Sequence, residues 1–250
     1  MKHFLLGIAI IFCSQNIFSQ DVNTLLKEAE KLMLLPNEKA AFLKYNEVLK
    51  QQPNNLIALT KSAELCSNIG NREANAKARD NYYKVAMSYA KTAYKLYPAN
   101  DEANVAMAIA QGRIILLKSG KEKIAAVKAL KMYAENATTA NPKNYKAWHI
   151  LGKWNYEVSS LNSLERSAAK LFYGALPSAS LSNAIANYEK AKSLSNTFLL
   201  NHLELAKAYK KNGDKIKAVA ELNYLLTQKN ISEDDAQYKI EATTLLKKWQ

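Results

Sequence analysis

Residues 145–191 read YKAWHILGKWNYEVSSLNSLERSAAKLFYGALPSASLSNAIANYEKA, and this stretch decides the fold. Apolar and small residues recur in it at helical spacing: Trp148, Leu151 and Gly152 in its first part, and Ala184, Tyr188 and Ala191 in its last. Side chains three or four positions apart share one face of an α-helix, so each part predicts a helix with one packed face. The segment between them, Ser163–Tyr173, predicts an inserted helix.

The two packed faces have the residue spacing of helices A and B in a tetratricopeptide (TPR) unit. Gly152 has no side chain, so the facing helix can come close there, and we expect Ala184 to be the small residue opposite. Near the end of the chain the helix A pattern recurs in its cleanest form: Leu205, Ala206 and Tyr209. We interpret all of these residues as repeat positions in a packed core.

Three prolines mark the ends of successive units. They stand 45 and 44 residues apart, at Pro53, Pro98 and Pro142, and an asparagine follows each within two residues: Asn54, Asn100 and Asn144. A standard unit has about 34 residues, so each of these units has about ten more. Lengthened B helices explain the additions most simply. We expect the turns before those helices at Gly70–Asn71 and Ser119–Gly120.

Composition agrees with an all-helical chain. The 250 residues include only 7 Gly and 5 Pro, against 48% hydrophobic residues, and runs of β-branched residues are scarce. No linker or low-complexity stretch divides the chain after residue 20. We therefore predict one domain over residues 20–250, an all-α, TPR-like, right-handed solenoid of about five helical hairpins. The last helix, Asp234–Trp249, is expected to cap the array.

The first residues have the order of a secretory signal peptide. Lys2 precedes a short apolar run, Phe4–Cys13, and a small residue, Ser19, stands at the expected cleavage site. An uncleaved interfacial anchor is the alternative, since ten apolar residues are too few to span a bilayer. Removal of residues 1–19 takes away one of the 35 basic residues and none of the 22 acidic ones, so the net charge becomes +12. Cys66 is then the one remaining cysteine, a core residue rather than a disulfide partner.

The inserted helix carries a resemblance to a known family. The resembling positions are His149, Leu151, Gly152, Trp154, Tyr156, Glu157, Val158, Leu161, Leu164, Glu165, Arg166, Ala169, Leu171–Gly174 and Pro177–Ser180. On these residues the chain resembles the regulator of microtubule dynamics family, here as an exported, bacterial-type member. The resemblance implies a TPR-like fold and a non-enzymatic adaptor. An exported protein would meet no microtubules, so we carry over the fold and the adaptor class alone.

No pattern in the sequence indicates catalysis, a cofactor or a metal. His149 and His202 stand 53 residues apart, and neither belongs to a ligand cluster. Glycine-rich phosphate loops and nucleophile motifs are missing as well. Glu165 and Arg166 are better explained as an ion pair or a cap to a neighbouring loop than as catalytic groups.

The positive charge is the strongest functional signal. The net charge is +13, and basic residues crowd the segment from Arg113 to Lys131, where Glu122 alone opposes them. A solvated helix face is the simpler explanation. The functional alternatives are an acidic protein partner or anionic lipid headgroups at a membrane surface. Nucleic acid is not expected, because basic and aromatic residues do not alternate.

Helix A residues line the concave wall of a TPR array. The register predicts a basic groove there, with apolar spots, formed by these residues: Ile109, Arg113, Lys146, His149, Lys153, Tyr156, Lys207 and Lys210. Such a groove suits an acidic peptide or a terminal carboxylate. We therefore expect an exported scaffold, in the periplasm, in the cell envelope or secreted, that binds a protein segment. An anionic phospholipid-binding module is the alternative.

Overall fold

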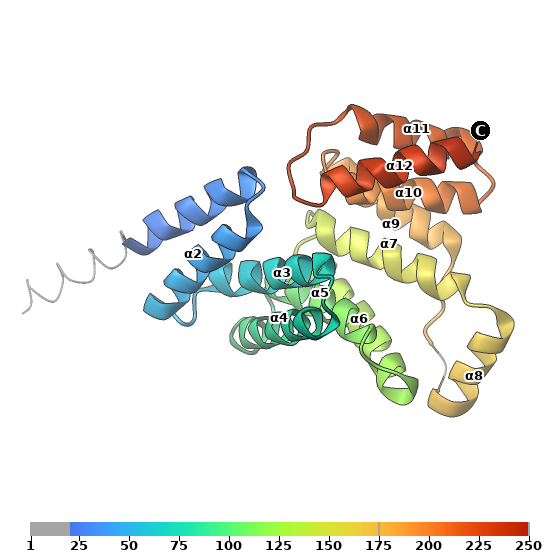
Figure 1. The fold of residues 1–250 in the computed structure, drawn as a ribbon. Coiled ribbons are helices and arrows are strands. Elements are labelled where there is room, and N and C mark those ends of the chain that lie inside the picture. Colours follow the sequence, from blue (N-terminus) through green and yellow to red (C-terminus); the bar gives the residue numbers. More distant parts are fainter. Residues whose placement is uncertain (1–20, 175, 250) are drawn as a thin grey trace, which may run out of the picture.

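The computed structural model describes residues 21–174 and 176–249, and the predicted signal peptide lies outside them. Within this range every regular element is a helix (Figure 1). A first helical stretch covers residues 21–34, and these helices follow: α2 (Glu38–Gln51), α3 (Leu56–Arg72), α4 (Ala76–Leu96), α5 (Asp101–Ile115), α6 (Gly120–Ala140), α7 (Tyr145–Ser160), α8 (Ser163–Tyr173), α9 (Leu181–Leu194), α10 (Leu199–Lys211), α11 (Lys215–Thr227) and α12 (Asp235–Trp249). The all-α prediction is confirmed. No helix in the described range is both long and apolar enough to cross a membrane.

The helices pair into five hairpins that stack into one array. Residues 21–34 share a core with α2, and the other pairs are α3 with α4, α5 with α6, α7 with α9, and α10 with α11. We call the first helix of each pair its A helix and the second its B helix. Successive A helices also contact one another, α3 on α5, α5 on α7 and α7 on α10. Helix α12 packs on α10 and α11, as expected of a cap.

The unusual repeat length comes from two long B helices, as predicted. Helices α4 and α6 have 21 residues each, whereas α2 and α9 have 14 and α11 has 13. The array is therefore a TPR-like solenoid whose second and third units are extended.

Asparagine side chains start most of the A helices. The side-chain oxygen of Asn100 accepts the backbone N–H of Ala103 at 3.0 Å, and Asn144 does the same for Ala147 at 3.2 Å. These are N-caps, which satisfy a backbone donor that the helix leaves unpaired. In the second unit the cap is Asn55 rather than Asn54. The proline that ends a B helix and the asparagine that follows it thus work together as a turn between units.

Two glycines sit where tyrosine rings press against a helix backbone. A Cβ on Gly152 would lie 2.6 Å from the Tyr188 ring, and one on Gly70 would lie 2.8 Å from the Cβ of Tyr82. The close approach predicted at Gly152 is present, but the residue opposite is the fully buried Tyr188 and not Ala184. The predicted turn at Gly70–Asn71 was wrong, because both residues belong to α3. Gly70 serves a close contact rather than a turn.

The segment between α7 and α9 forms the predicted inserted helix, α8. Asn162 and Glu165 make a reciprocal capping box at its start, with distances of 2.8 and 2.9 Å. The Arg166 guanidinium donates to the Val158 carbonyl at 3.1 Å, which caps the end of α7. Both residues therefore serve the helix ends, in line with the structural role expected of this pair.

The first and last parts of the array meet. Arg72, at the end of α3, forms ion pairs with Glu38 at 2.7 Å and with Glu233 and Asp234 at 3.0 Å each. Glu233 also accepts the Glu38 backbone N–H at 2.6 Å. In Figure 1 the loop between α11 and α12 reaches toward the start of α2. We call these four residues the Arg72 clasp, since they join segments 195 residues apart.

Candidate functional site

The predicted groove residues lie on three successive A helices. Arg113 and Ile109 are on α5, Lys146, His149, Lys153 and Tyr156 are on α7, and Lys207 and Lys210 are on α10. The structure adds carboxylates to this set, and they pair with the lysines across helix boundaries. We call the surface formed by these side chains and their partners the A-helix face.

Glu64 on α3 is the first charge centre of the A-helix face. It pairs with Lys61 on its own helix at 3.4 Å and with Lys146 on α7, which is 82 residues away in the chain. Burial raises the pKa of Glu64, but Lys146 and Lys61 lower it more strongly, and the net value is about 2. The carboxylate is therefore ionised at neutral pH and holds α3 against α7.

Glu204 on α10 is the second charge centre. It accepts Lys153 of α7 at 2.7 Å and Lys207 of its own helix at 2.9 Å. Burial raises its pKa, and the two lysines more than offset this, so the pKa of Glu204 lies below its ordinary value. Each lysine also has an outer partner, Glu157 at 2.9 Å for Lys153 and Glu241 at 2.8 Å for Lys207. Helices α7, α10 and α12 are thus linked by one chain of charges.

Aromatic rings lie among these charges. The Lys153 and Lys211 ammonium groups lie 5.9 and 5.1 Å from the centre of the Tyr156 ring. Lys210 lies 5.8 Å from the Trp249 ring of α12. Ammonium groups at these distances interact favourably with a ring face. Lys153 keeps 44% of its side chain exposed and is the most accessible of the four lysines that pair with Glu64 and Glu204.

His149 does not face solvent. Its Nδ1 lies 3.0 Å from the side-chain oxygen of Asn201, and its ring contacts Phe198 and Tyr188 at centroid distances of 4.9 and 5.5 Å. Burial lowers the pKa of His149, so the ring is neutral at pH 7. Asn201 in turn donates to the Tyr188 carbonyl at 2.9 Å. The structure places His149 in the contact between units, as a packing residue.

Arg113 and Ile109 also bind within the molecule. The Arg113 guanidinium donates to the Asn71 side chain at 3.0 Å and lies 5.8 Å from the Tyr83 ring. Ile109 is half-buried against Val105 and neighbouring residues. Arg113 thus ties α5 to the end of α3 and contributes less free charge than the sequence pattern predicts.

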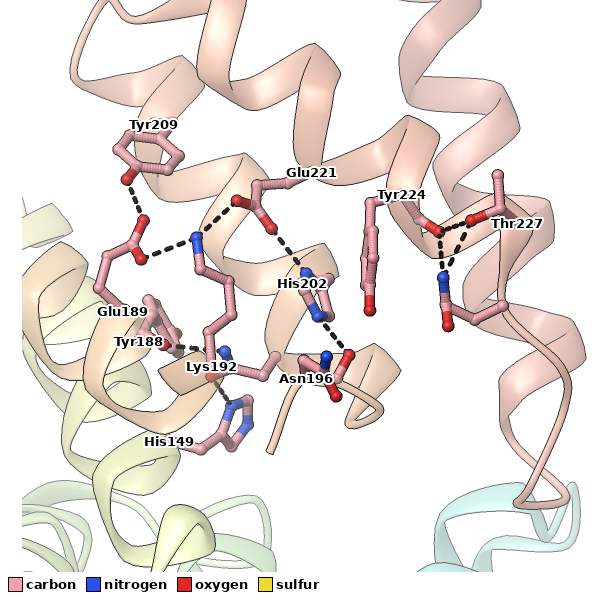
Figure 2. Close-up of polar contacts among 12 residues, drawn as sticks. His149, Tyr188, Glu189, Lys192, Asn196, His202, Tyr209, Glu221, Tyr224 and Thr227 are labelled. Carbon is pink, nitrogen blue, oxygen red and sulfur yellow. Dashed lines mark hydrogen bonds and ion pairs between the residues drawn. The ribbon is translucent and has the colours of Figure 1, made fainter. Parts of the chain in front are cut away.

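A second polar network lies on the B-helix side of the last two units (Figure 2). His202 of α10 is between Glu221 at 2.6 Å and the Asn196 carbonyl at 2.9 Å, so an acceptor faces each ring nitrogen. Lys192 bridges Glu189 at 2.7 Å and Glu221 at 2.9 Å, and the Tyr209 hydroxyl donates to Glu189. The network borders an open depression between α9 and α11. The charged groups of this network pair with one another, which indicates a structural role.

The described residues present charged and aromatic groups that are suited to binding. No group of three or more His, Cys, Asp and Glu side chains there has the geometry of a metal site. Cys66 is buried, and burial raises the pKa of its thiol to about 12, so it is not a nucleophile at neutral pH. Lysines, carboxylates and exposed rings recognise other chains through ion pairs and stacking.

Sequence reasoning missed the carboxylates that accompany the lysines. Glu64 and Glu204 stand three positions from Lys61 and Lys207, a spacing at which opposite charges meet on one helix. That signal was available, and it would have predicted a mixed charge pattern. The partners from other units, Lys146 and Lys153, depend on how the hairpins stack, which the sequence does not specify.

Comparison with known proteins gives a consistent picture. The model of the family described as regulator of microtubule dynamics protein 1-3 matches residues 25–250. Regulator of microtubule dynamics protein 1 of Caenorhabditis elegans is 28% identical over 160 residues, 64% of this chain and 71% of that protein. Protein 3 of Xenopus laevis is 25% identical over 210 residues, 84% of this chain and 43% of that protein. Protein 1 of Bos taurus is 29% identical over 163 residues, 65% of this chain and 51% of that protein.

A solved structure supports the fold. A thermophilic TPR protein from Thermus thermophilus superposes with a TM-score of 0.67 and 16% sequence identity. The superposition covers 90% of this chain and 98% of that protein. At this identity the similarity concerns the fold alone, and it confirms the prediction of a TPR-like solenoid.

Proposed function

Because this chain belongs to the regulator of microtubule dynamics family and folds as a TPR-like interaction scaffold, we propose that it binds an acidic protein segment on its A-helix face. It has no catalytic role in this proposal. The matched regions cover about half of the Xenopus and bovine relatives. Fold and family therefore support the role of an interaction scaffold. The position of the binding site has to be argued from the residues of this chain.

The observation that carries the proposal is the position of Lys153. Its ammonium group holds the buried Glu204 on one side and the exposed Glu157 on the other, beside the Tyr156 ring. A surface pair between residues four apart is weak, typically about 0.5 kcal/mol. A carboxylate of a partner can therefore replace Glu157 at low cost, while Glu204 keeps the lysine in place.

Neighbouring groups extend this site. Lys211 lies on the Tyr156 ring as well, and its ammonium group donates to Ser160. Lys207 and Lys210 continue the positive charge along α10 toward Trp249. A peptide with carboxylates and one apolar side chain would find cations and aromatic surface along α7 and α10. The buried carboxylates fix the lysines in advance, which lowers the entropy lost on binding.

We propose that the protein acts outside the cytoplasm, because its N-terminal residues have the order of a secretory signal. The names of the relatives concern microtubule dynamics. An exported chain would not meet microtubules, so the proposal takes over the scaffold role without that partner. Cell fractionation, with sequencing of the mature N-terminus, tests the location, and a protein that starts at Gln20 in the envelope fraction is the expected result.

The binding site is tested by Lys153→Gln. Glu204 keeps Lys207 as a counter-ion in this variant, so the fold should be retained. Partners are first captured from native cells with the unaltered protein, and their affinity is then measured by titration calorimetry. Loss of a charge-assisted contact predicts binding weaker by about tenfold or more. Tyr156→Ala should weaken the binding of the same partner, because the aromatic ring is lost.

The matched control is Lys190→Gln on α9, whose side chain is exposed on the B-helix side. This variant should bind as the unaltered protein does. Equal affinity of the Lys153→Gln and Lys190→Gln proteins for every captured partner would refute the A-helix face as the binding site.

A further inference from the structure

Helix α8 exposes large apolar side chains where most surface helices are polar. Leu164 and Leu171 are each 77% exposed. They stand seven positions apart, with Ala168 between them at a helical position, so they form one apolar stripe. On another side of the helix, Ala169 is buried where α8 packs on α6. The stripe thus points away from the body of the protein.

Contacts at both ends of α8 set its orientation. Its start is fixed by the capping box of Asn162 and Glu165, and Arg166 connects it to the end of α7. At its other end Gly174 adopts a left-handed backbone, with φ of 79°, close to the Lys128 ammonium group of α6. The fold therefore maintains the exposure of the two leucines.

Positive charge lies on the same two helices that form this end of the molecule (Figure 1). Lysines without an ion pair in the described structure lie on α8 and on the first half of α6: Lys121, Lys123, Lys128 and Lys170. The nearby carboxylates are engaged, Glu165 in the capping box and Glu122 with Lys118 at 2.7 Å. Leu116, 65% exposed, adds apolar surface at the turn before α6. Figure 1 shows α8 and the start of α6 projecting at the same end of the molecule. We call this region the α6–α8 edge.

We infer that the α6–α8 edge docks on an anionic lipid bilayer, with Leu164 and Leu171 inserted at the headgroup level and the lysines against lipid phosphates. An interfacial helix needs one apolar face, a charged opposite side and low overall hydrophobicity. Helix α8 has all three properties, and the lysines of α6 add the attraction to anionic headgroups. Because the edge projects from the molecule, it suits a broad surface such as a bilayer. A peptide would need a groove instead.

This inference goes beyond the proposed function and concerns another part of the molecule. The A-helix face binds its partner through α7 and α10, whereas the edge belongs to α6 and the insertion. A protein docked by the edge would hold its scaffold face beside a membrane. Variants of α7 therefore test the partner site, and variants of α6 and α8 test membrane docking independently.

The test is co-sedimentation of the full chain with vesicles. Vesicles of phosphatidylcholine with about 30% phosphatidylserine should bind the protein, and vesicles of phosphatidylcholine alone should bind it at least about tenfold less. Binding should decrease with added salt, because the attraction is between surface charges. The same comparison is made for two variants, Leu164→Gln with Leu171→Gln, and Lys121→Gln with Lys123→Gln.

Both variants should bind anionic vesicles more weakly by about tenfold or more, with unchanged circular dichroism, because the replaced side chains are exposed. The matched controls are Ile216→Gln, which removes a residue 84% exposed on α11, and Lys190→Gln on α9. Both controls should bind as the unaltered protein does. A Leu164→Trp protein should show a blue shift of its emission on anionic vesicles.

Three results would overturn the inference. The first is failure of the unaltered protein to bind anionic vesicles, and the second is binding of both edge variants that is as strong as its own. The third result is loss of a captured protein partner in the leucine variant without any vesicle binding, which would identify the edge as a protein interface. The Lys153→Gln protein should keep its vesicle binding. Vesicle binding therefore tests the α6–α8 edge even if the A-helix face binds no partner.

Discussion

Gly152 is the residue whose substitution tests the packing between α7 and α9 most directly. In Gly152→Ala the new Cβ would lie 2.6 Å from the Tyr188 ring, a distance that requires the ring or the helices to move. Overpacking of this kind costs about 1–3 kcal/mol of the free energy of unfolding. Urea denaturation should show that loss, and Gly152→Leu should show a larger one.

Gly112→Ala is the matched control for that change. Gly112 also lies in an A helix, but its Cβ would meet only the tip of the Leu130 side chain at 3.4 Å. The helical preference of alanine should make this substitution neutral or stabilising by about 0.5–1 kcal/mol. Equal effects at the two glycines would mean that the Tyr188 contact does not limit the approach of α7 and α9.

The pH dependence of stability should report on Glu64. Its pKa is about 2 in the folded protein, below the ordinary 4.5, so the ionised form stabilises the fold. That contribution is present above about pH 4.5 and is lost as the pH falls toward 2, and its size is on the order of 3 kcal/mol. Urea denaturation between pH 6 and 2 should therefore show a shallower decrease for Glu64→Gln than for the unaltered protein. The control, Glu47→Gln at a more exposed pair with Lys44, should keep the full decrease, and parallel curves for all three would contradict the role of Glu64.

For single residues, the sequence predicted which side chains are buried better than it predicted which charged side chains form ion pairs. Trp148 and Leu151 pack on the preceding unit as the spacing required, and Ala184, Ala191, Leu205, Ala206 and Tyr209 are buried. Helical periodicity carries that information, because it states which side chains share a face. The counter-ions of Lys146 and Lys153 come from other hairpins. Only the stacking of units determines them, so the sequence could not.

Among the helices, α8 is the one whose removal should leave the fold intact. Its one buried side chain in the described structure is Ala169, which is 7% exposed, and α7 and α9 already pair with each other directly. We expect replacement of residues 162–176 by a short Gly/Ser linker to cost less than about 2 kcal/mol, since little apolar surface is lost. Thermal unfolding followed by circular dichroism should stay cooperative.

Truncation before α12 is the comparison for that deletion. This helix buries Ala242 and packs Tyr238, Leu245 and Trp249 on α10 and α11. Its loss should expose the end of the core and lower the melting temperature far more than deletion of α8. If the α8 deletion were the more damaging of the two, α8 would be a structural element rather than a docking one.

Element boundaries followed from a few strong local signals. Proline and asparagine mark the ends and starts of helices chemically, so α5 and α7 begin directly after Asn100 and Asn144, and α8 has the predicted bounds. The predicted turn at Gly70 was wrong because glycine occurs for two reasons, a left-handed turn or a close contact with another element. Its contact with Tyr82 and Tyr83 lies across a hairpin, and the spacing alone does not separate these uses.

The curvature of the whole array brings its ends together, and no local pattern predicts that. Glu38 and Glu233 are 195 residues apart and meet only because each hairpin turns slightly relative to the previous one. The solenoid class could be inferred from the repeat. Its closure could not, since small rotations accumulate over five units.

We expect the Arg72 clasp to hold the two ends of the array together. One guanidinium faces the carboxylates of Glu38, Glu233 and Asp234, so Arg72→Met leaves three acidic groups together without a cation. Burial raises the pKa of Glu38, Arg72 lowers it, and the charges of Asp234 and Glu233 raise it again, so the net pKa lies above its ordinary value even with the arginine present. Loss of one partner from a largely buried pair costs on the order of 3 kcal/mol, enough to separate the loop from α2.

Spin labels at Lys39→Cys and Lys229→Cys, both exposed positions, should reveal the opening as a longer and broader distance distribution. Cys66 is buried and its thiol has a pKa of about 12, so it should not take up label. Arg79→Met removes an arginine whose one ion pair in the described part of the chain is with the adjacent Asp80 at 3.7 Å, and it should leave the distance unchanged. Glu233→Gln with Asp234→Asn should restore the short distance in the Arg72→Met protein, because it removes the repulsion. An unchanged distribution in Arg72→Met would mean that the ends are held by packing and not by the clasp.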